Sequence, residues 1–140
     1  MGQSVLITGG ASGLGLAIAQ RFVEEGANVA IVARRAGPLE EAVAEISQGS
    51  GGAIAAFACD VSSAESISNA HAQIVARFGP ADILVNNAGQ AAGKSFLEIT
   101  DEEWQADLDL KLMAAVRMTR LVWPHMAQQK WGRVINLLNT

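Results

Sequence analysis

The chain has 140 residues, half of them apolar, with a net charge of -4 and a pI near 5.1. This length fits one domain, residues 1–140, and an acidic chain whose only basic pair is Arg34-Arg35 argues against a nucleic-acid partner. The positive mean hydropathy favours strands buried on both faces, which is typical of α/β proteins.

Short apolar runs alternate regularly with segments of helical period. The pattern predicts strands at 5–8, 29–33, 53–59, 83–86 and 134–138, with helices at 13–25, 38–47, 63–78 and 100–124. The first helix carries Leu14, Ile18 and Phe22 on one stripe, and the last begins with a Thr100/Glu103 capping box. Repeated βαβ units of this kind predict a doubly wound parallel sheet of about five strands.

The apolar side of the last helix is predicted to be a stripe of Trp104, Leu108, Leu112 and Ala115. Tryptophans 104, 123 and 131 are interpreted as packing this helix and the last strand.

Several residue types narrow the classes of site. Cys59 is the single cysteine, and we interpret it as a small buried hydrophobe rather than a catalytic thiol. His71 and His125 have no partner ligand at metal-binding spacing, so no metal site is predicted. The N-terminus does not resemble a signal peptide and no apolar run has transmembrane length, so we expect a cytoplasmic protein without a membrane partner.

A glycine-rich turn, "TGGASGLG" from Thr8 to Gly15, joins the first predicted strand to the first helix. Glycines at this place let backbone N–H groups approach a pyrophosphate, and the helix N-terminus favours its negative charge. A plain tight turn is the alternative interpretation.

Two further motifs follow later strands: "DV" at Asp60-Val61 and "NNAG" at Asn86–Gly89. With the glycine turn they resemble the short-chain dehydrogenases/reductases, and the similarity continues through residues 102–112 and "GRVINLL". The resemblance implies a Rossmann sheet of about seven strands, of which this chain supplies the first five. Strands six and seven are therefore expected beyond Thr140.

The same resemblance implies a set of cofactor-binding residues. The pyrophosphate is expected at Gly9, Ser12, Gly13, Leu14 and Gly15, and the adenosine end at Asp60, Val61, Asn87, Ala88 and Gly89. Asp60 would accept a hydrogen bond from the adenine amino group, and Asn86 would tie its strand to the neighbouring strands. The alternative for Asp60 is the N-terminal cap of the following helix.

Cofactor preference is expected at the end of the second strand, where an acid selects NAD and a cation selects NADP. Ala33 occupies the acid position and Arg34 follows it, so we predict NADP ahead of NAD. The alternative is a solvated Arg34 without a ligand, and Arg35 is interpreted as an exposed neighbour.

The catalytic positions depart from the family pattern. Lys111 stands where the family has Asn, Asn139 stands where it has Ser, and the chain contains no Tyr. Lys111 and Asn139 are the candidate catalytic residues, although Lys111 also suits an ion pair with Asp107. The family's Tyr and Lys are expected beyond Thr140, so residues 1–140 are expected to bind the cofactor without turnover.

By resemblance, the parent protein transfers a hydride between a nicotinamide and a small-molecule carbonyl or alcohol. The alternative function is a noncatalytic dinucleotide-binding or interaction module. The family also implies a homo-oligomer, because its long helix commonly lies at a dimer face.

Overall fold

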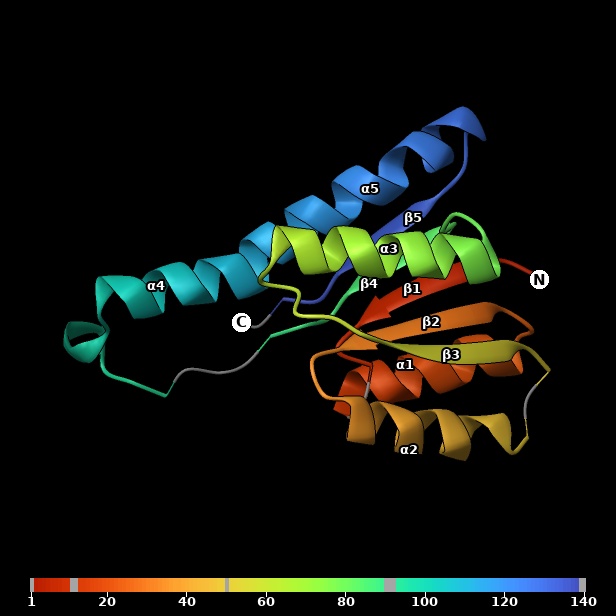
Figure 1. Ribbon diagram of the computed structural model, residues 1–140, viewed down its shortest axis with the longest axis horizontal. Coiled ribbons are helices and arrows are strands. Elements are labelled where there is room, and N and C mark those ends of the chain that lie inside the picture. Colours follow the sequence, from red (N-terminus) through yellow and green to blue (C-terminus); the bar gives the residue numbers. More distant parts are fainter. Residues whose placement is uncertain (1, 11–12, 50, 90–92, 139–140) are drawn as a thin grey trace.

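The computed structural model describes residues 2–10, 13–49, 51–89 and 93–138. Five parallel strands form one sheet in the order β3-β2-β1-β4-β5 (Figure 1). Their bounds are β1 Ser4–Thr8, β2 Asn28–Ala33, β3 Ala53–Ala58, β4 Ile83–Asn86 and β5 Arg133–Asn136. The predicted doubly wound α/β fold is confirmed, and β5 ends before Leu138, the predicted boundary.

Helices cover both faces of the sheet (Figure 1). One face carries α1 (Gly13–Glu24) and α2 (Ala36–Ser47), and the other carries α3 (Ala64–Phe78) and α5 (Ala114–Gln128). Successive side chains of β1 point to opposite faces of the sheet. Val5 and Ile7 pack against α1 and α2, and Leu6 packs against α3 and α5. All three side chains are buried, which explains the continuous apolar run in this strand.

The buried stripe of α1 differs from the predicted one. Leu14 is 61% exposed, and the residues that face the sheet are Gly15, Ala19 and Val23. Ile18 and Phe22 flank this stripe and are half-buried. The prediction is therefore wrong at Leu14, while Ile18 and Phe22 pack against the core as predicted. Gly15 and Ala19 are small, which lets the helix approach the sheet closely.

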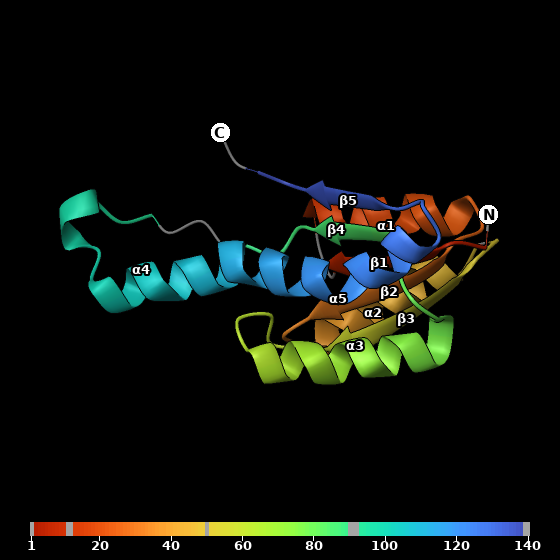
Figure 2. The same cartoon turned by 90° about the horizontal axis from the view of Figure 1, so that it is seen from above.

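The long helix contains a π-helical turn. It starts as α4 (Asp101–Leu108), passes through η2 (Asp109–Met113) and continues as α5. The predicted Thr100/Glu103 capping box is present. Both views show α4 extending beyond the sheet (Figures 1 and 2).

The prediction that the helix stops near Pro124 is wrong. The helix runs on to Gln128, and Val122 and Met126 are buried against the sheet on either side of the proline. This packing of α5 on the core outweighs one lost helical hydrogen bond.

The three tryptophans are more exposed than the sequence predicts. Trp104, Trp123 and Trp131 are 42%, 59% and 38% exposed. Trp104 contacts Phe96 of the 3₁₀ turn η1 (Phe96–Glu98) edge to face, and Trp131 lies under the guanidinium of Arg133. Leu108 at the end of α4 and Leu112 in the π turn, both in the predicted stripe, are also exposed.

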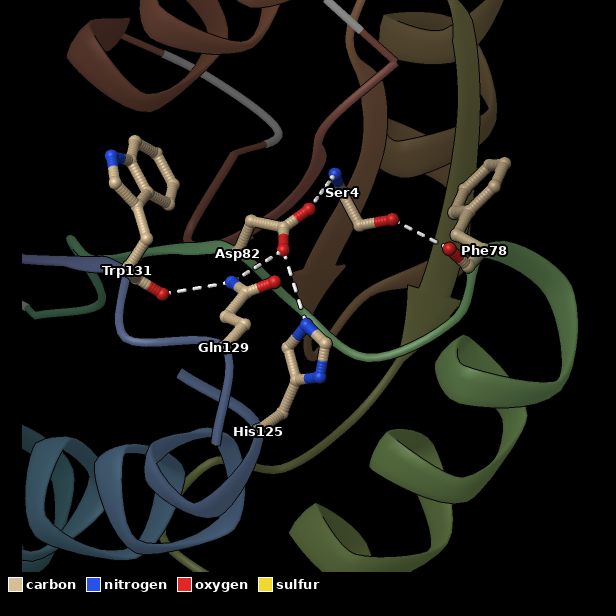
Figure 3. Close-up of polar contacts among 6 residues, drawn as sticks. All are labelled: Ser4, Phe78, Asp82, His125, Gln129 and Trp131. Carbon is tan, nitrogen blue, oxygen red and sulfur yellow. Dashed lines mark hydrogen bonds and ion pairs between the residues drawn. The ribbon is translucent and has the colours of Figure 1, made fainter. Parts of the chain in front are cut away.

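Asp82 contacts several elements at the N-terminal ends of the strands (Figure 3). Its Oδ2 accepts from the backbone N–H of Ser4 at 2.9 Å, and its Oδ1 lies 2.9 Å from Nε2 of Gln129 and 3.1 Å from Nε2 of His125. This carboxylate therefore connects β1 to the end of α5.

Candidate functional site

The carboxyl ends of β1 and β4 meet at the point where the sheet reverses its winding direction. β1 pairs with β2 on one side and with β4 on the other, so the loops after β1 and β4 diverge from adjacent strands. Ligands of open α/β sheets bind at such a switch point. The predicted glycine turn and the NNAG segment both lie there.

Thr8 links these two segments. Its Oγ1 accepts hydrogen bonds from the backbone N–H groups of Asn87 and Ala88, both at 3.0 Å. Gly9 follows with φ +67, a conformation that favours glycine, and its N–H donates to the carbonyl of Val32 at 2.8 Å. The turn after β1 is therefore fixed to both neighbouring strands.

Gly15 sits where no side chain fits. A Cβ at this position would lie 2.3 Å from the carbonyl oxygen of Gly9 and 2.5 Å from Nδ2 of Asn87. That same Nδ2 donates to the Gly9 oxygen at 3.1 Å, so helix, turn and NNAG segment are in mutual contact. Gly13 differs: its φ is +59 and a Cβ there would meet no described atom within 4 Å.

The loop after β3 carries the predicted acid. Oδ1 of Asp60 accepts from the N–H of Ser62 at 3.0 Å and from its hydroxyl at 2.6 Å. These two bonds from Ser62, and the nearby positive charge of Arg34, outweigh partial burial and hold the pKa of Asp60 below its ordinary value. The alternative role of Asp60 as a helix cap is wrong, because Ser63 is the N-cap of α3.

A small pocket of about 160 Å³ lies between the ends of β2 and β3. It brings together predicted residues from four parts of the sequence, namely Gly9, Arg34, Asp60, Val61, Ala88 and Gly89. Cys59 also lines it, and its predicted burial is confirmed. Burial raises the pKa of the Cys59 thiol, which disfavours the nucleophilic thiolate.

A larger open cleft of about 1710 Å³ extends from the glycine turn along the π turn and α5. Leu14, Asn87 and Lys111 line it. The stem of Lys111 passes within 4 Å of the position that a Cβ on Gly89 would occupy. Its Nζ lies 2.8 Å from Oδ1 of Asp107, so the ion pair considered from the sequence is present.

Asn86 ties its strand to the next, as predicted: its Nδ2 donates to Oδ1 of Asn136 at 2.8 Å. Ser12 and Asn139 lie outside the described residues. The sequence analysis did not identify Thr8, although its place directly before the first glycine was a signal. It also did not identify Ser62, although a serine two residues after an aspartate is typical of a turn closed by the aspartate side chain. The π turn has no comparable signal.

The family model described as short chain dehydrogenase matches residues 3–138. The chain belongs to the short-chain dehydrogenase family. Among its curated relatives, D-beta-hydroxybutyrate dehydrogenase of Cupriavidus necator is 39% identical over 140 residues, which cover 99% of this chain and 54% of the relative. D-threitol dehydrogenase of Mycolicibacterium smegmatis is 36% identical, with 97% and 52% covered.

Solved structures of other proteins have the same fold. L-sorbose reductase of Gluconobacter frateurii, complexed with NADPH and L-sorbose, gives a TM-score of 0.90 at 39% identity, covering 96% of this chain and 51% of the other. A metagenomic short-chain oxidoreductase in complex with NADP gives 0.93 at 33% identity, covering 99% and 63%. The chain therefore spans about half the length of the curated relatives it matches.

The glycine positions fit a dinucleotide. Gly15 allows α1 to approach the turn. Gly13, where a Cβ would meet no described atom, begins α1, and the helix dipole favours an anion at this end. Across the described ranges, no cluster of three or more potential metal ligands occurs. None of the helices in those ranges combines the length and apolar character that crossing a membrane requires.

Proposed function

We propose that residues 1–140 bind NADP in preference to NAD and form the cofactor-binding part of an oxidoreductase that acts on a small carbonyl or alcohol. The observation that carries this proposal is the small pocket that Arg34 and Asp60 share with Gly9, the first glycine of the turn. Arg34 would bind the 2′-phosphate and Asp60 the adenine amino group. Gly9, Gly13, Leu14 and Gly15 would hold the pyrophosphate, with Ser12 as a further predicted contact.

A bound nicotinamide dinucleotide supplies or takes up a hydride. The chain's own residues orient it: Asn87, Ala88 and Gly89 form one wall of the site, and Thr8 fixes that wall through two backbone N–H groups. Lys111 lies on the same cleft, and we propose that it supports proton movement there, with Asn139 as the predicted contact to the substrate oxygen. NADPH-containing neighbours support the cofactor proposal.

Replacement of Arg34 by alanine tests the cofactor preference. We expect NADPH affinity to fall roughly tenfold or more, because a charge-assisted contact is worth about 1.5–3 kcal/mol. NADH affinity should change by less than about twofold, since NADH lacks the phosphate. Calorimetric titration of both cofactors measures the two losses.

Arg35→Ala is the matched comparison, because it removes an adjacent guanidinium on the same loop. It should weaken NADPH less than Arg34→Ala does. Equal losses of NADH and NADPH affinity in the Arg34 variant would contradict a role in binding the 2′-phosphate.

The second candidate is a noncatalytic dinucleotide-binding or interaction module. The observation in its favour is the Lys111–Asp107 ion pair, which occupies the lysine in a structural contact. NADPH oxidation by the parent protein, measured against a panel of aldehydes and ketones, separates the two candidates. Turnover that falls in a Lys111→Met variant supports the enzyme, and NADPH binding without any turnover supports the module.

We also propose that the protein forms homo-oligomers through the projecting helix. Phe96, Leu97, Trp104, Leu108 and Leu112 are all more than 40% exposed along this arm of the molecule. Several exposed large apolar side chains on one projecting arm are typical of a protein interface.

A further inference from the structure

The loop that carries Asp60 is held by a chain of hydrogen bonds that begins on the long helix. Nη1 of Arg117 donates to the carbonyl oxygen of Ser62 at 3.2 Å, although the two residues are 55 positions apart. Ser62 then donates to Oδ1 of Asp60 through both its N–H and its hydroxyl. A guanidinium on α5 is thus connected to the Asp60 carboxylate through one intervening residue.

The two carboxylate oxygens of Asp60 differ in their hydrogen bonds. Oδ1 accepts both bonds from Ser62, and no group within the described ranges donates to Oδ2. The bonds also favour the ionised carboxylate, as the lowered pKa of Asp60 indicates. Asp60 lines the small pocket beside Gly9 and Arg34, so this pocket contains an oriented anionic acceptor with one oxygen available.

An oriented anionic acceptor distinguishes two purine bases. Adenine carries an amino group at position 6, which donates a hydrogen bond to a carboxylate. Hypoxanthine carries an oxygen at that position, which repels a carboxylate, and a donor N–H at the adjacent N1, which a carboxylate reaches only by turning. The preference depends on where the free oxygen points, because a carboxylate that rotates can turn away from the wrong base.

We propose that Arg117 is a positioning residue for the adenine end of the cofactor, acting through Ser62 to fix the orientation of the Asp60 carboxylate. Arg117 itself touches neither base nor phosphate in this arrangement; it sets how strongly the site prefers adenine to hypoxanthine. The inference rests on the proposed function, because it needs a dinucleotide in this pocket.

The test measures dissociation constants of the protein for NADPH and for its hypoxanthine analogue, reduced nicotinamide hypoxanthine dinucleotide phosphate. The wild-type protein should prefer NADPH by roughly tenfold or more, as expected for a charge-assisted hydrogen bond. Arg117→Met and Ser62→Ala should each reduce this preference to about threefold or less. Asp60→Ala gives the preference that remains without the carboxylate, and Arg117→Met and Ser62→Ala are compared with it.

Arg77→Met is the matched control, because its guanidinium lies over the Phe78 ring at the far end of α3, away from the pocket. It should keep the wild-type preference. A general loss of stability would weaken the binding of both ligands and leave the ratio of their dissociation constants unchanged. A change in this ratio therefore reports on the orientation of Asp60. Ser62→Ala tests the second link separately, because it removes the hydroxyl that donates to Asp60 and keeps the carbonyl that accepts from Arg117. If Arg117→Met fails to fold, Arg117→Gln takes its place in the comparison.

The two proposals fail in different ways. A wild-type protein that does not bind NADPH overturns the proposed function. A protein that binds NADPH and its hypoxanthine analogue equally, or whose preference survives in Arg117→Met, overturns the positioning role of Arg117 and leaves cofactor binding standing.

Discussion

Replacement of Gly15 by alanine is expected to abolish NADPH binding and to destabilise the fold. The added methyl group would lie 2.3 Å from the Gly9 carbonyl oxygen, and that backbone atom cannot swing aside as a flexible side chain would. Either α1 or the turn after β1 must move, and the Asn87 contact with both is lost. We expect affinity to fall at least about a hundredfold and the free energy of unfolding to fall by about 1–3 kcal/mol, as in overpacked cores.

Gly37→Ala is the matched control for this change. Gly37 lies on α2, where an added methyl group would meet no described atom within 4 Å and where φ is not positive, so alanine there should leave NADPH affinity unchanged. Calorimetric titration and urea unfolding of both variants give the comparison. Wild-type affinity in Gly15→Ala would show that the packing of α1 against the turn does not shape the binding site.

Asp82→Ala is expected to lower the free energy of unfolding by about 3 kcal/mol. Removal of the carboxylate leaves the N–H of Ser4 without its partner and breaks the contacts to His125 and Gln129. An intramolecular hydrogen bond contributes about 1 kcal/mol, and an unsatisfied buried group costs about 1–3 kcal/mol. Cofactor affinity should change little, since this cluster is at the opposite end of the strands from the glycine turn.

The same carboxylate gives stability a defined pH dependence. Burial opposes ionisation of Asp82, but the bonds from Ser4, Gln129 and His125 together outweigh it and hold its pKa below the ordinary value. A lowered folded-state pKa stabilises the protein above the unfolded-state pKa of about 4, and this stability is lost as the pH falls through the folded value. The difference between wild type and Asp82→Asn should therefore shrink as the pH falls below about 4.

Glu41→Gln is the control for this pH dependence, because Glu41 is exposed on α2. Urea unfolding at a series of pH values measures both variants. A wild-type to Asp82→Asn difference that stays constant down to pH 2 would mean that the carboxylate is not stabilised by its native partners.

The sheet and the location of the site could be predicted because their signals are local. A buried parallel strand such as 83–86 is a short apolar run, and the glycines after β1 are needed by the backbone of their own turn. The order of the motifs along the chain then places them at the ends of adjacent strands. Even the Lys111–Asp107 ion pair follows from helical spacing alone.

The features that could not be predicted depend on partners distant in sequence. Arg117 meets Ser62 across 55 positions, and Asp82 meets Ser4 across 78. No periodicity or spacing in the sequence predicts either contact. Pro124 is a different case, because its local preference to end a helix is real but weaker than the packing of Val122 and Met126 on the core.

The π turn at Asp109–Met113 sets the angular phase between α4 and α5. Each residue advances an α-helix by about 100°, so a turn wider by one residue offsets everything before it by about that angle relative to everything after it. Residues 104, 108, 112 and 115, which would form one line on a regular helix, therefore belong to two lines. Deletion of a single residue here would restore regular winding and turn the whole arm carrying Trp104 about its axis, while the strands kept their register. The direction in which that arm faces thus depends on the one extra residue in the π turn.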